Sequence, residues 1–482
     1  MNKLYTTLLI YILIFSGTVV SQRLVEIIDQ TEKAAIKVSA HTPNGDLLAE
    51  SCGFFISSDG IAIFPAHMFF NSDSITVQTF NGRKLGVQRL LQLHPQADLA
   101  LVKIAAPKTR EFTYLIPSKQ ITRENQDVLI FGHPSDMEDG MAIENIKEFK
   151  YQLFLGRISK LTGSMSAKSD GAPVINNKGE LVGIVEAYSK DSPPLSVCPN
   201  IINDTNWVNI NLPVHLIKHN PVLKSKMNQY FNEGLYYLSA ENYERSARAF
   251  SNYLKLIKDD PVIYALRGHA RFMYKNTFGC KEDLTLSKRM DHHGYLPFYF
   301  EGLHYLEDNK KEEALLNFTI CLDKKPNFSY ALVERGRLRE VLNKDLEKAF
   351  NDFIEATEVD TVYGAGFYEK ARFILKYYDD KNVANYDIDK AIDLDPGLPG
   401  VYSIRGMMRI NNENYLAAIQ DLETALTKDP NDIPALFNKG IAEYNLGMKD
   451  KACKDWEKAG TLGHYKSIKY LSRYCTGSDR KY

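Results

Sequence analysis

A pattern of glycines, small residues and large apolar residues repeats along the second half of the chain. Gly234, Gly268, Gly302 and Gly336 lie 34 residues apart, and the period resumes at Gly406 and Gly440. A small residue follows five of these glycines after twelve positions, and a large apolar residue follows four positions later (Ser246 and Phe250, Cys280 and Leu284, Ala314 and Phe318, Ala418 and Leu422, Ala452 and Trp456). The pattern predicts pairs of helices that approach closely at the small residues, with the large residue filling the space between them.

The middle of this array departs from the period. Ala349 arrives one residue late, and in the fifth unit, near residues 365–398, Arg372 stands where the glycine is expected. A local change in the curvature of the array is expected there. Pro326, Pro396 and Pro430 are expected to follow the ends of second helices, since proline cannot continue a helix.

The repeat resembles the tetratricopeptide repeat, over about residues 227–460 and about seven units. The resemblance implies an all-α solenoid whose first helices line a concave groove that binds protein or peptide partners. Apolar and aromatic lining favours an extended peptide or a helix as the ligand. Each lining residue could equally belong to the packing between neighbouring repeats. The residues expected along the groove are Val262, His269, Phe272, Tyr299, Leu303 and Leu306.

Residues 461–482 are expected to form a capping helix and a tail. The helix, predicted over 461–475, would cover the apolar face that the last repeat of such an array otherwise exposes.

Residues 22–218 show a different pattern. Short apolar runs rich in β-branched and aromatic residues are separated by turn signals, among them Asn44-Gly45 and Asp59-Gly60, which predicts an all-β domain. The predicted strands include residues 35–40, 53–56, 61–64, 99–104, 128–131 and 181–185.

The first 21 residues have the features of an export signal. Lys3 supplies a positive charge, residues 8–15 supply a short apolar stretch, and small residues around Ser21 offer a cleavage site before Gln22. The apolar run is short for a membrane-spanning helix, so no integral span is expected after cleavage. The mature protein is therefore expected to be secreted or periplasmic.

Charge and cysteine content narrow the range of partners. The formal net charge is -1 and the charges form no basic stripe, which gives no electrostatic support for binding nucleic acid.

Six cysteines in 482 residues do not make a disulfide framework. Cys280, Cys321 and Cys453 are expected to act as small apolar residues of the repeats. Pairing of Cys52 with Cys198 stays open. His292 and His293 have few ligand-like neighbours and are interpreted as a solvated loop; no metal and no cofactor are expected.

Three segments of the first half resemble the trypsin-like serine proteases, particularly the bacterial HtrA-like branch. The stretch CGFFISSDGIAIFPAHMFF resembles the hairpin that leads to the family's histidine, and QADLALVKI resembles its aspartate strand. The resemblance covers about residues 24–217. It implies a double β-barrel with His67 as general base and Asp98 as the residue that orients the imidazole.

The same resemblance places an aspartate at the nucleophile position. In this family the serine lies three residues before a proline, and in AKSDGAPVINNKGELVGI the residue three before Pro173 is Asp170, while Ser169 lies one residue early. A carboxylate is a poor acyl acceptor for amides, and beside His67 it favours the charged imidazolium. Asp170 therefore predicts that the protease site is inactive.

Three hypotheses follow. The first is an exported, non-enzymatic interaction protein in which the repeat array recruits partners. The second is an active serine endopeptidase that uses His67, Asp98 and Ser169, or else Ser166 or Ser164, with the repeats presenting substrate. The third is a structural scaffold of the cell envelope in which the barrel merely stabilises the array. For the site itself the alternative also stays open that His67 and Asp98 are an ordinary buried hydrogen-bonded pair with no inherited catalytic role.

Overall fold

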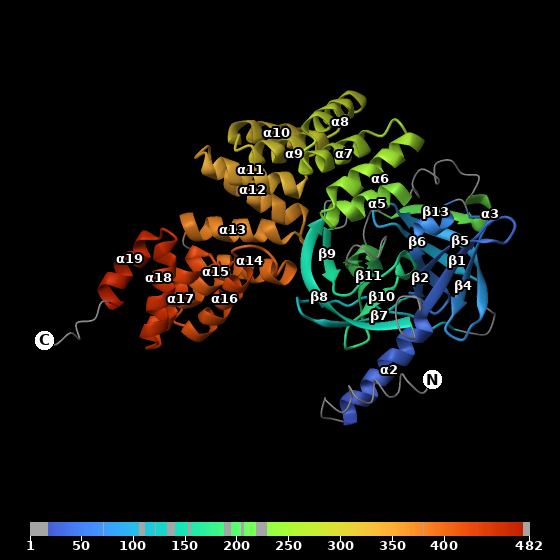
Figure 1. Ribbon diagram of the computed structural model, residues 1–482, viewed down its shortest axis with the longest axis horizontal. Coiled ribbons are helices and arrows are strands. Elements are labelled where there is room, and N and C mark those ends of the chain that lie inside the picture. Colours follow the sequence, from blue (N-terminus) through green and yellow to red (C-terminus); the bar gives the residue numbers. More distant parts are fainter. Residues whose placement is uncertain are drawn as a thin grey trace. The chain divides into compact units, whose positions relative to one another are not determined.

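The computed structural model describes residues 18–70, 72–105, 111–120, 122–132, 140–152, 156–187, 194–203, 207–217, 229–378 and 380–475 (Figure 1). The chain divides into two compact units, Met1–Phe300 and Glu301–Tyr482. The apolar stretch of the expected export signal and the tail after Cys475 lie outside the described residues.

Six strands close the first barrel, in the order β5, β4, β1, β2, β3, β6, with β5 and β6 paired across the closure. A seventh strand, β13, adds to the outside of β5. The bounds are β1 Ala35–His41, β2 Leu47–Phe55, β3 Ile61–Pro65, β4 Ser74–Thr79, β5 Lys84–His94, β6 Leu99–Ile104 and β13 Val208–Pro213. Phe55, Phe64, Val77 and Val102 fill its interior, each with no exposed surface.

The second barrel closes in the order β10, β11, β12, β9, β8, β7. Its strands are β7 Asp127–Phe131, β8 Met141–Gln152, β9 Gly156–Leu161, β10 Pro173–Ile175, β11 Leu181–Glu186 and β12 Leu195–Val197. Every residue of β11 is buried. The short turns η1 (Ala66–Phe69), after β3, and η3 (Ala167–Ser169), before β10, carry the candidate site.

The predicted strands are confirmed in both barrels. The run at 99–104 coincides with β6, and the runs at 35–40 and 181–185 end one residue short of β1 and β11. Helix α2 (Thr18–Ala34) precedes β1 and crosses the expected cleavage point. Its residue Ile27 is buried against the barrels and belongs to the part that cleavage before Gln22 would retain.

Seven pairs of helices follow in the described part of the chain, in agreement with the predicted solenoid class (Figure 1). They are α5 Gln229–Ser239, α6 Tyr243–Leu256, α7 Pro261–Met273, α8 Thr277–Met290, α9 Leu296–Glu307, α10 Lys311–Lys324, α11 Ser329–Val341, α12 Leu346–Val359, α13 Gly364–Tyr377, α14 Lys381–Leu394, α15 Val401–Asn411, α16 Tyr415–Lys428, α17 Ile433–Asn445 and α18 Lys449–Thr461. As predicted, α10, α14 and α16 each end two residues before a proline.

The periodic glycines lie against the large apolar residues, as their spacing predicts. A Cβ atom on Gly234 would come within 2.4 Å of the Phe250 ring, and one on Gly440 would come within 2.4 Å of the Trp456 indole. Because Cβ atoms essentially never approach heavy atoms so closely, only glycine lets the two helices of a pair reach this separation.

The interpretation of the fifth repeat was wrong by one residue. Ala371, which is fully buried, takes the place of the glycine and packs in one cluster with Ile388. Arg372 lies one position later and instead forms ion pairs with Glu340 and Glu369. The fourth and fifth repeats each contain one extra residue between the close-packed position and the large apolar residue, so the period lengthens without losing the packing.

Buried ion pairs recur beside the close-packed positions. In three repeats the residue before the periodic glycine is an arginine, and it forms an ion pair with the aspartate that precedes the large apolar residue. A second arginine, one helical turn after the first, pairs with the same aspartate. These aspartates are 1–3 % exposed, and burying a charged carboxylate costs free energy. The paired arginines offset that cost, so the aspartates can stay ionised. The three bridges are Arg267–Asp283–Arg271, Arg335–Asp352–Arg339 and Arg405–Asp421–Arg409, with N–O distances of 2.7–2.9 Å.

Helix α5 packs against the barrels within the first unit. Tyr236 and Tyr237 belong to the same apolar cluster as barrel residues such as Leu129 and Leu195. The Gln152 side chain of β8 donates a hydrogen bond to the Leu235 carbonyl at 3.0 Å. The first helix of the array is thus anchored to the β domain by both apolar and polar contacts.

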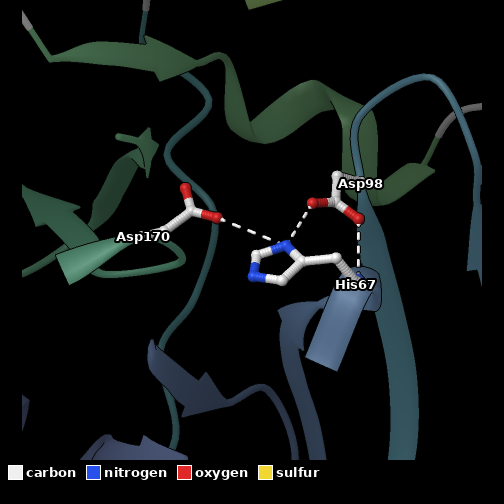
Figure 2. A group of neighbouring side chains, drawn as sticks. All are labelled: His67, Asp98 and Asp170. Atoms are coloured by element: carbon white, nitrogen blue, oxygen red, sulfur yellow. Dashed lines mark hydrogen bonds and ion pairs between the residues drawn. The ribbon is translucent and has the colours of Figure 1, made fainter. Parts of the chain in front are cut away.

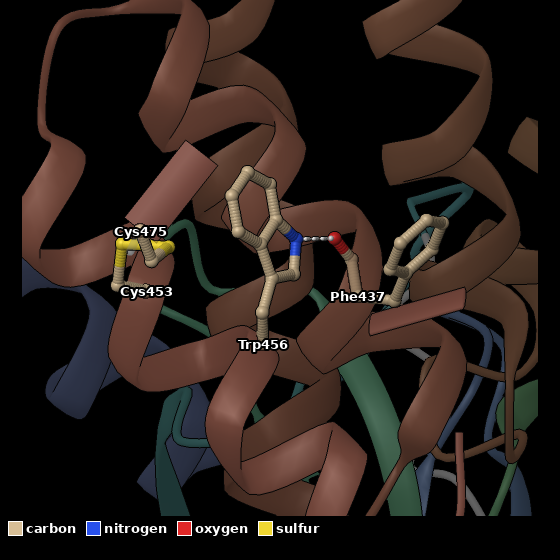
Figure 3. The surroundings of a disulfide bond; sticks show 4 residues. All are labelled: Phe437, Cys453, Trp456 and Cys475. Atoms are coloured by element: carbon tan, nitrogen blue, oxygen red, sulfur yellow. Dashed lines mark hydrogen bonds between the residues drawn. A yellow bond between two sulfur atoms is a disulfide. The ribbon is translucent and has the colours of Figure 1, made fainter. Parts of the chain in front are cut away.

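The chain end forms the helix α19 (Tyr465–Tyr470) and the π-helical turn η5 (Leu471–Cys475). Tyr470 contacts the Trp456 ring edge-on at 5.1 Å. A disulfide joins Cys453 to Cys475, with Cα atoms 5.8 Å apart, close to the Trp456 indole that donates to the Phe437 carbonyl (Figure 3). The expectation that Cys453 is a free apolar residue was therefore wrong, because the chain folds back and brings a second cysteine beside it.

Candidate functional site

His67 and Asp98 form a tightly held pair at the edge of the first barrel (Figure 2). Asp98 receives a hydrogen bond from the His67 backbone N–H at 2.9 Å, and its other oxygen lies 2.5 Å from His67 Nδ1. Asp98 adopts a left-handed conformation with φ of 50°, which is uncommon for a residue other than glycine. Its carbonyl accepts from the Ala66 N–H at 2.6 Å, so the turn before β6 and η1 position each other.

Asp170 follows η3 and directs its carboxylate toward His67 (Figure 2). Oδ2 lies 3.8 Å from His67 Nδ1, and Oδ1 accepts a hydrogen bond from the Ala187 N–H at 3.0 Å. The carboxylate therefore lies on the same side of the imidazole as Asp98. The structure brings together His67, Asp98 and Asp170, three of the residues singled out from the sequence.

Gly171 fixes the register of this turn. Its φ is +79°, and a Cβ atom there would lie 2.4 Å from both the Cys52 carbonyl oxygen and Pro65 Cδ. The backbone on either side is also held, because the Cys52 N–H donates to the Asp170 carbonyl at 2.8 Å and the Gly171 N–H donates to the Val185 carbonyl at 2.9 Å. A slip that put Ser169 in place of Asp170 would force Asp170 into this glycine-only position.

The three candidate serines differ in exposure. Ser169 has no exposed surface, so a peptide could reach its hydroxyl only if the turn opened. Ser166 is half-buried and its hydroxyl caps η3 by accepting from the Lys168 N–H at 3.3 Å. Ser164 is exposed.

The backbone N–H groups of this turn point back into the chain. Lys168 N–H donates to the Ser166 hydroxyl at 3.3 Å, and Asp170 N–H donates to the Ala167 carbonyl at 3.3 Å. Serine proteases use N–H groups at the nucleophile to stabilise the oxyanion of the tetrahedral intermediate. In this structure η3 already occupies those donors.

A third carboxylate, Glu186, was missed from the sequence. It ends β11, is 8 % exposed, and the charges of Asp170 and Asp98 act on it. Within the described residues its carboxylate makes no hydrogen bond or ion pair. The available signal was an acidic residue directly at the end of the fully buried run LVGIV. We call His67, Asp98, Asp170 and Glu186 together the acidic pocket.

Burial and charge shift the pKa values of the acidic pocket. The pKa of His67 is raised to about 9: burial lowers it, but the charge and hydrogen bond of Asp98 and the charge of Asp170 outweigh burial. Burial raises the pKa of Asp170 to about 7, against the opposing effect of His67. Burial also raises the pKa of Glu186 well above its usual range. The raised pKa of His67 favours the protonated imidazole at neutral pH.

A cavity of about 330 Å³ opens on the first unit and is lined mainly by residues of β1, β2 and β4. Its lining includes Lys37, Cys52, Phe80 and Phe131. Cys52 links the cavity to the site because its N–H donates to the Asp170 carbonyl. Cys52 and Cys198 are not joined by a disulfide in the described part of the chain, and the Cys52 thiol donates to the Lys168 carbonyl at 3.4 Å.

Some of the predicted groove residues are buried in the packing between helices, and others are partly exposed. The His269 ring of α7 stacks on Phe300 of α9 at 4.5 Å, and burial lowers its pKa to about 4. Tyr299 is 8 % exposed. Phe272, Leu303 and Leu306 are half-buried. His269 and Tyr299 thus contribute mainly to helix packing, and binding at the groove stays a prediction.

Residues 51–184 match the family model described as the trypsin-like peptidase domain. The β domain is a trypsin-like peptidase domain. The match begins before His67 and ends after Gly171, so it includes the histidine, the aspartate and the turn of the acidic pocket.

Two solved structures resemble the trypsin-like peptidase domain. The active form of the Rv3671c protease from M. tuberculosis is 18% identical with a TM-score of 0.31, covering 37% of this chain and 81% of that one. Deg5 is 16% identical with a TM-score of 0.33, covering 38% of this chain and 91% of that one.

Relatives match the two halves separately. A probable periplasmic serine endoprotease, DegP-like, from Brucella suis is 26% identical over 149 residues, 30% of this chain and 29% of the relative. Tetratricopeptide repeat protein 6 of Homo sapiens is 30% identical over 173 residues, 34% of this chain and 32% of the relative. A DnaJ homolog subfamily C member 7 homolog of Dictyostelium discoideum is 25% identical over 174 residues, 33% of this chain and 32% of the relative. The matches span about a third of the length of each relative.

None of the helices in the described part of the chain combines the length and the hydropathy that crossing a membrane requires.

Proposed function

We propose that this protein is an exported interaction protein in which a catalytically inactive trypsin-like peptidase domain is joined to repeats that bind protein or peptide. The observation that carries the loss of activity is the position of Asp170. Asp170 stands three residues before Pro173, where the family has the serine whose hydroxyl loses its proton to a neutral imidazole, and its carboxylate lies 3.8 Å from His67 Nδ1. Gly171 supports this register, because it leaves no room for the shifted turn that attack by Ser169 would need.

The occupied N–H groups of η3 support the same conclusion independently. Even with a serine at position 170, the oxyanion of a tetrahedral intermediate would have to displace the bond from the Asp170 N–H to the Ala167 carbonyl. Residual hydrolysis through another nucleophile would face the same requirement.

The proposed compartment is extracytoplasmic. The expected export signal supports this location, as does the disulfide between Cys453 and Cys475, since disulfides persist in oxidising compartments. We propose the boundaries 1–21 for the signal, 22–218 for the peptidase domain, 227–460 for the repeats and 461–482 for the cap and tail. N-terminal sequencing of the secreted protein tests the first of these, with Gln22 as the expected first residue.

Labelling with a fluorophosphonate probe tests the inactivity of the peptidase domain. The native protein and the Ser169→Ala variant are both expected to stay unlabelled. Labelling of the native protein that disappears in Ser169→Ala would establish the alternative, an active serine endopeptidase that uses His67, Asp98 and Ser169. Labelling of an Asp170→Ser variant alone would show that only the nucleophile has been lost.

Binding by the repeats is tested with a peptide library and a matched pair of variants. Phe272 of α7 lies in the predicted groove, whereas Phe278 of α8 is 74 % exposed and lies outside it. Phe272→Asp is expected to lose the peptides selected by the native protein, and Phe278→Asp is expected to keep them. Equal loss in both variants, or no selection by the native protein, would contradict the proposed binding.

A further inference from the structure

Most of the residues expected along the predicted groove occupy two fixed positions of a first helix. One position directly follows the close-packed residue, and the other lies three residues later, on the same face of the helix. In the second repeat these positions hold His269 and Phe272, and in the third they hold Leu303 and Leu306. The same count from each close-packed residue follows the predicted groove into the later repeats.

Charged residues occupy these positions in the middle of the array. Counted from Gly336, they are Arg337 and Glu340 of α11, and counted from Ala371, the first of them is Arg372 of α13. Both helices belong to the second unit. The lining of the predicted groove therefore changes from apolar to charged at the fourth and fifth repeats.

A continuous series of ion pairs links α11 to α13. Arg337 Nη1 lies 2.7 Å from a Glu334 oxygen, and Arg337 Nε lies 2.9 Å from a Glu369 oxygen. Lys376 Nζ lies 3.0 Å from a Glu340 oxygen. We call the six side chains of this series the charged ladder; in bonding order they are Glu334, Arg337, Glu369, Arg372, Glu340 and Lys376.

The cations of the charged ladder are more exposed than its carboxylates. The side chains of its two arginines and its lysine are 28–55 % exposed, whereas those of its three glutamates are 3–18 % exposed. The carboxylates balance the charge of the ladder but are largely covered by protein. The part of the ladder that meets water is therefore mainly guanidinium and ammonium.

Arg337 also has hydrogen-bond donors to spare. It bonds Glu369 through Nε and Glu334 through Nη1, while its Nη2 group makes no hydrogen bond within the described part of the chain. A carboxylate supplies the acceptor oxygens that such a group bonds most strongly. A cationic ligand would instead meet exposed groups of its own charge.

We infer that the charged ladder binds an acidic segment of an extended peptide, whose Asp or Glu side chains accept hydrogen bonds from Arg337 and Lys376. Arginine clusters recognise acidic motifs in this way. The inference rests on the proposed binding of peptides by the repeats and specifies the chemistry of the partner.

The positions on either side of the charged ladder indicate what flanks the acidic residues. Leu303 and Leu306 precede the ladder in the third repeat, and Met407 and Ile410 occupy the equivalent positions of the sixth, on α15. All four are half-buried. The bound peptide is therefore expected to carry apolar residues on both sides of its acidic residues and to continue past them.

Selection from two random peptide libraries by the full chain tests this partner chemistry. One library has amidated C-termini and the other has free C-termini. The native protein is expected to select, from both, peptides with Asp or Glu between apolar residues. Selection from the free-acid library alone would show recognition of a terminal carboxylate and overturn the inference. Selection from neither library would contradict the proposed peptide binding and this inference with it.

Arg337→Gln combined with Lys376→Gln is the test variant. It removes two exposed positive charges, while Glu340 and Glu369 each keep Arg372 as a partner. A selected amidated peptide is expected to bind this variant about tenfold or more weakly than it binds the native protein. The same peptide with amides in place of its acids is expected to bind both proteins equally. Lys376→Gln alone changes the most exposed member of the ladder and is expected to lose part of the affinity.

Lys310→Gln combined with Lys348→Gln is the matched control. Both lysines are exposed, pair with Asp308 and Asp345, and belong to the second helices α10 and α12 and their caps. This control is expected to keep the native affinity. Raising the salt concentration from about 0.05 M to about 0.5 M should weaken the acidic peptide more than its amide counterpart. Selected peptides without acidic residues, or equal affinities in variant and control, would overturn the acidic partner and leave peptide binding by the repeats intact.

Discussion

Replacing Asp170 with asparagine should stabilise the barrels, and increasingly so as the pH rises. Asparagine keeps the carbonyl oxygen that accepts from the Ala187 N–H but never becomes charged. In the folded native chain the pKa of Asp170 is about 7, against an ordinary value of 3.8. Between these two values the folded chain holds a proton that the unfolded chain has released.

The sign and size of the effect follow from this difference in bound protons. The stability contributed by protonated Asp170 is fully present below about pH 4 and is lost as the pH rises to about 7. Each pKa unit corresponds to about 1.4 kcal/mol. Between pH 5 and pH 8 the native chain therefore loses the equivalent of about two pKa units, or about 3 kcal/mol, of unfolding free energy. Asp170→Asn does not undergo this loss.

The assay uses the two tryptophans of the chain, Trp207 and Trp456. In a Trp456→Phe background, fluorescence reports on Trp207, whose indole donates to the Ile201 carbonyl in the first unit. Urea unfolding is measured from pH 5 to pH 8 with a chelator in every buffer. Asp46→Asn removes an exposed carboxylate of the first barrel and serves as control. A stability difference between Asp170→Asn and its parent that stays constant or shrinks toward pH 8 would refute the reasoning.

Three further predictions concern the repeats. Asp352→Ala leaves two half-buried arginines without their shared partner and should cost about 3 kcal/mol in urea unfolding, whereas Asp308→Ala, at an exposed ion pair, should change stability by less than about 1 kcal/mol. Gly440→Ala should cost about 1–3 kcal/mol and change the fluorescence of Trp456, because the new methyl group meets its ring; an unchanged spectrum and midpoint would contradict the close packing. Cys475→Ser should lower the stability of the last repeat by about 3 kcal/mol or less, read as faster amide exchange in α18 that reductant reproduces in the native protein.

Periodicity predicted the fold well because it reflects local packing. The 34-residue spacing located the glycines that lie against Phe250 and Trp456, and the contact is decided within one helix pair. The fifth repeat was misread at Arg372 because a single extra residue shifts the register, and the small residue displaced by one position is Ala371, which packs with Ile388. Sequence spacing alone does not distinguish a missing glycine from a displaced one.

The sequence predicted only those site residues that lie in recognisable family motifs. His67, Asp98 and Asp170 lie in recognisable segments, and the structure brings their side chains together. Glu186 belongs to a strand whose pattern indicates a buried core, and its proximity to Asp170 depends on how the second barrel closes. The Cys453–Cys475 bond depends in the same way on the chain reversing after α18.

The docking of α5 on the barrels affects how the protein is made and dissected. Tyr236 and Tyr237 are buried with barrel residues, so the β domain covers the end of the solenoid where a polar capping repeat would otherwise be needed. During synthesis the barrels leave the ribosome first and can offer a preformed surface on which the first repeat folds. A fragment that begins at residue 229 would expose both tyrosines to water and is expected to aggregate. We therefore expect the trypsin-like peptidase domain to act as the solubility cap of the array that follows it.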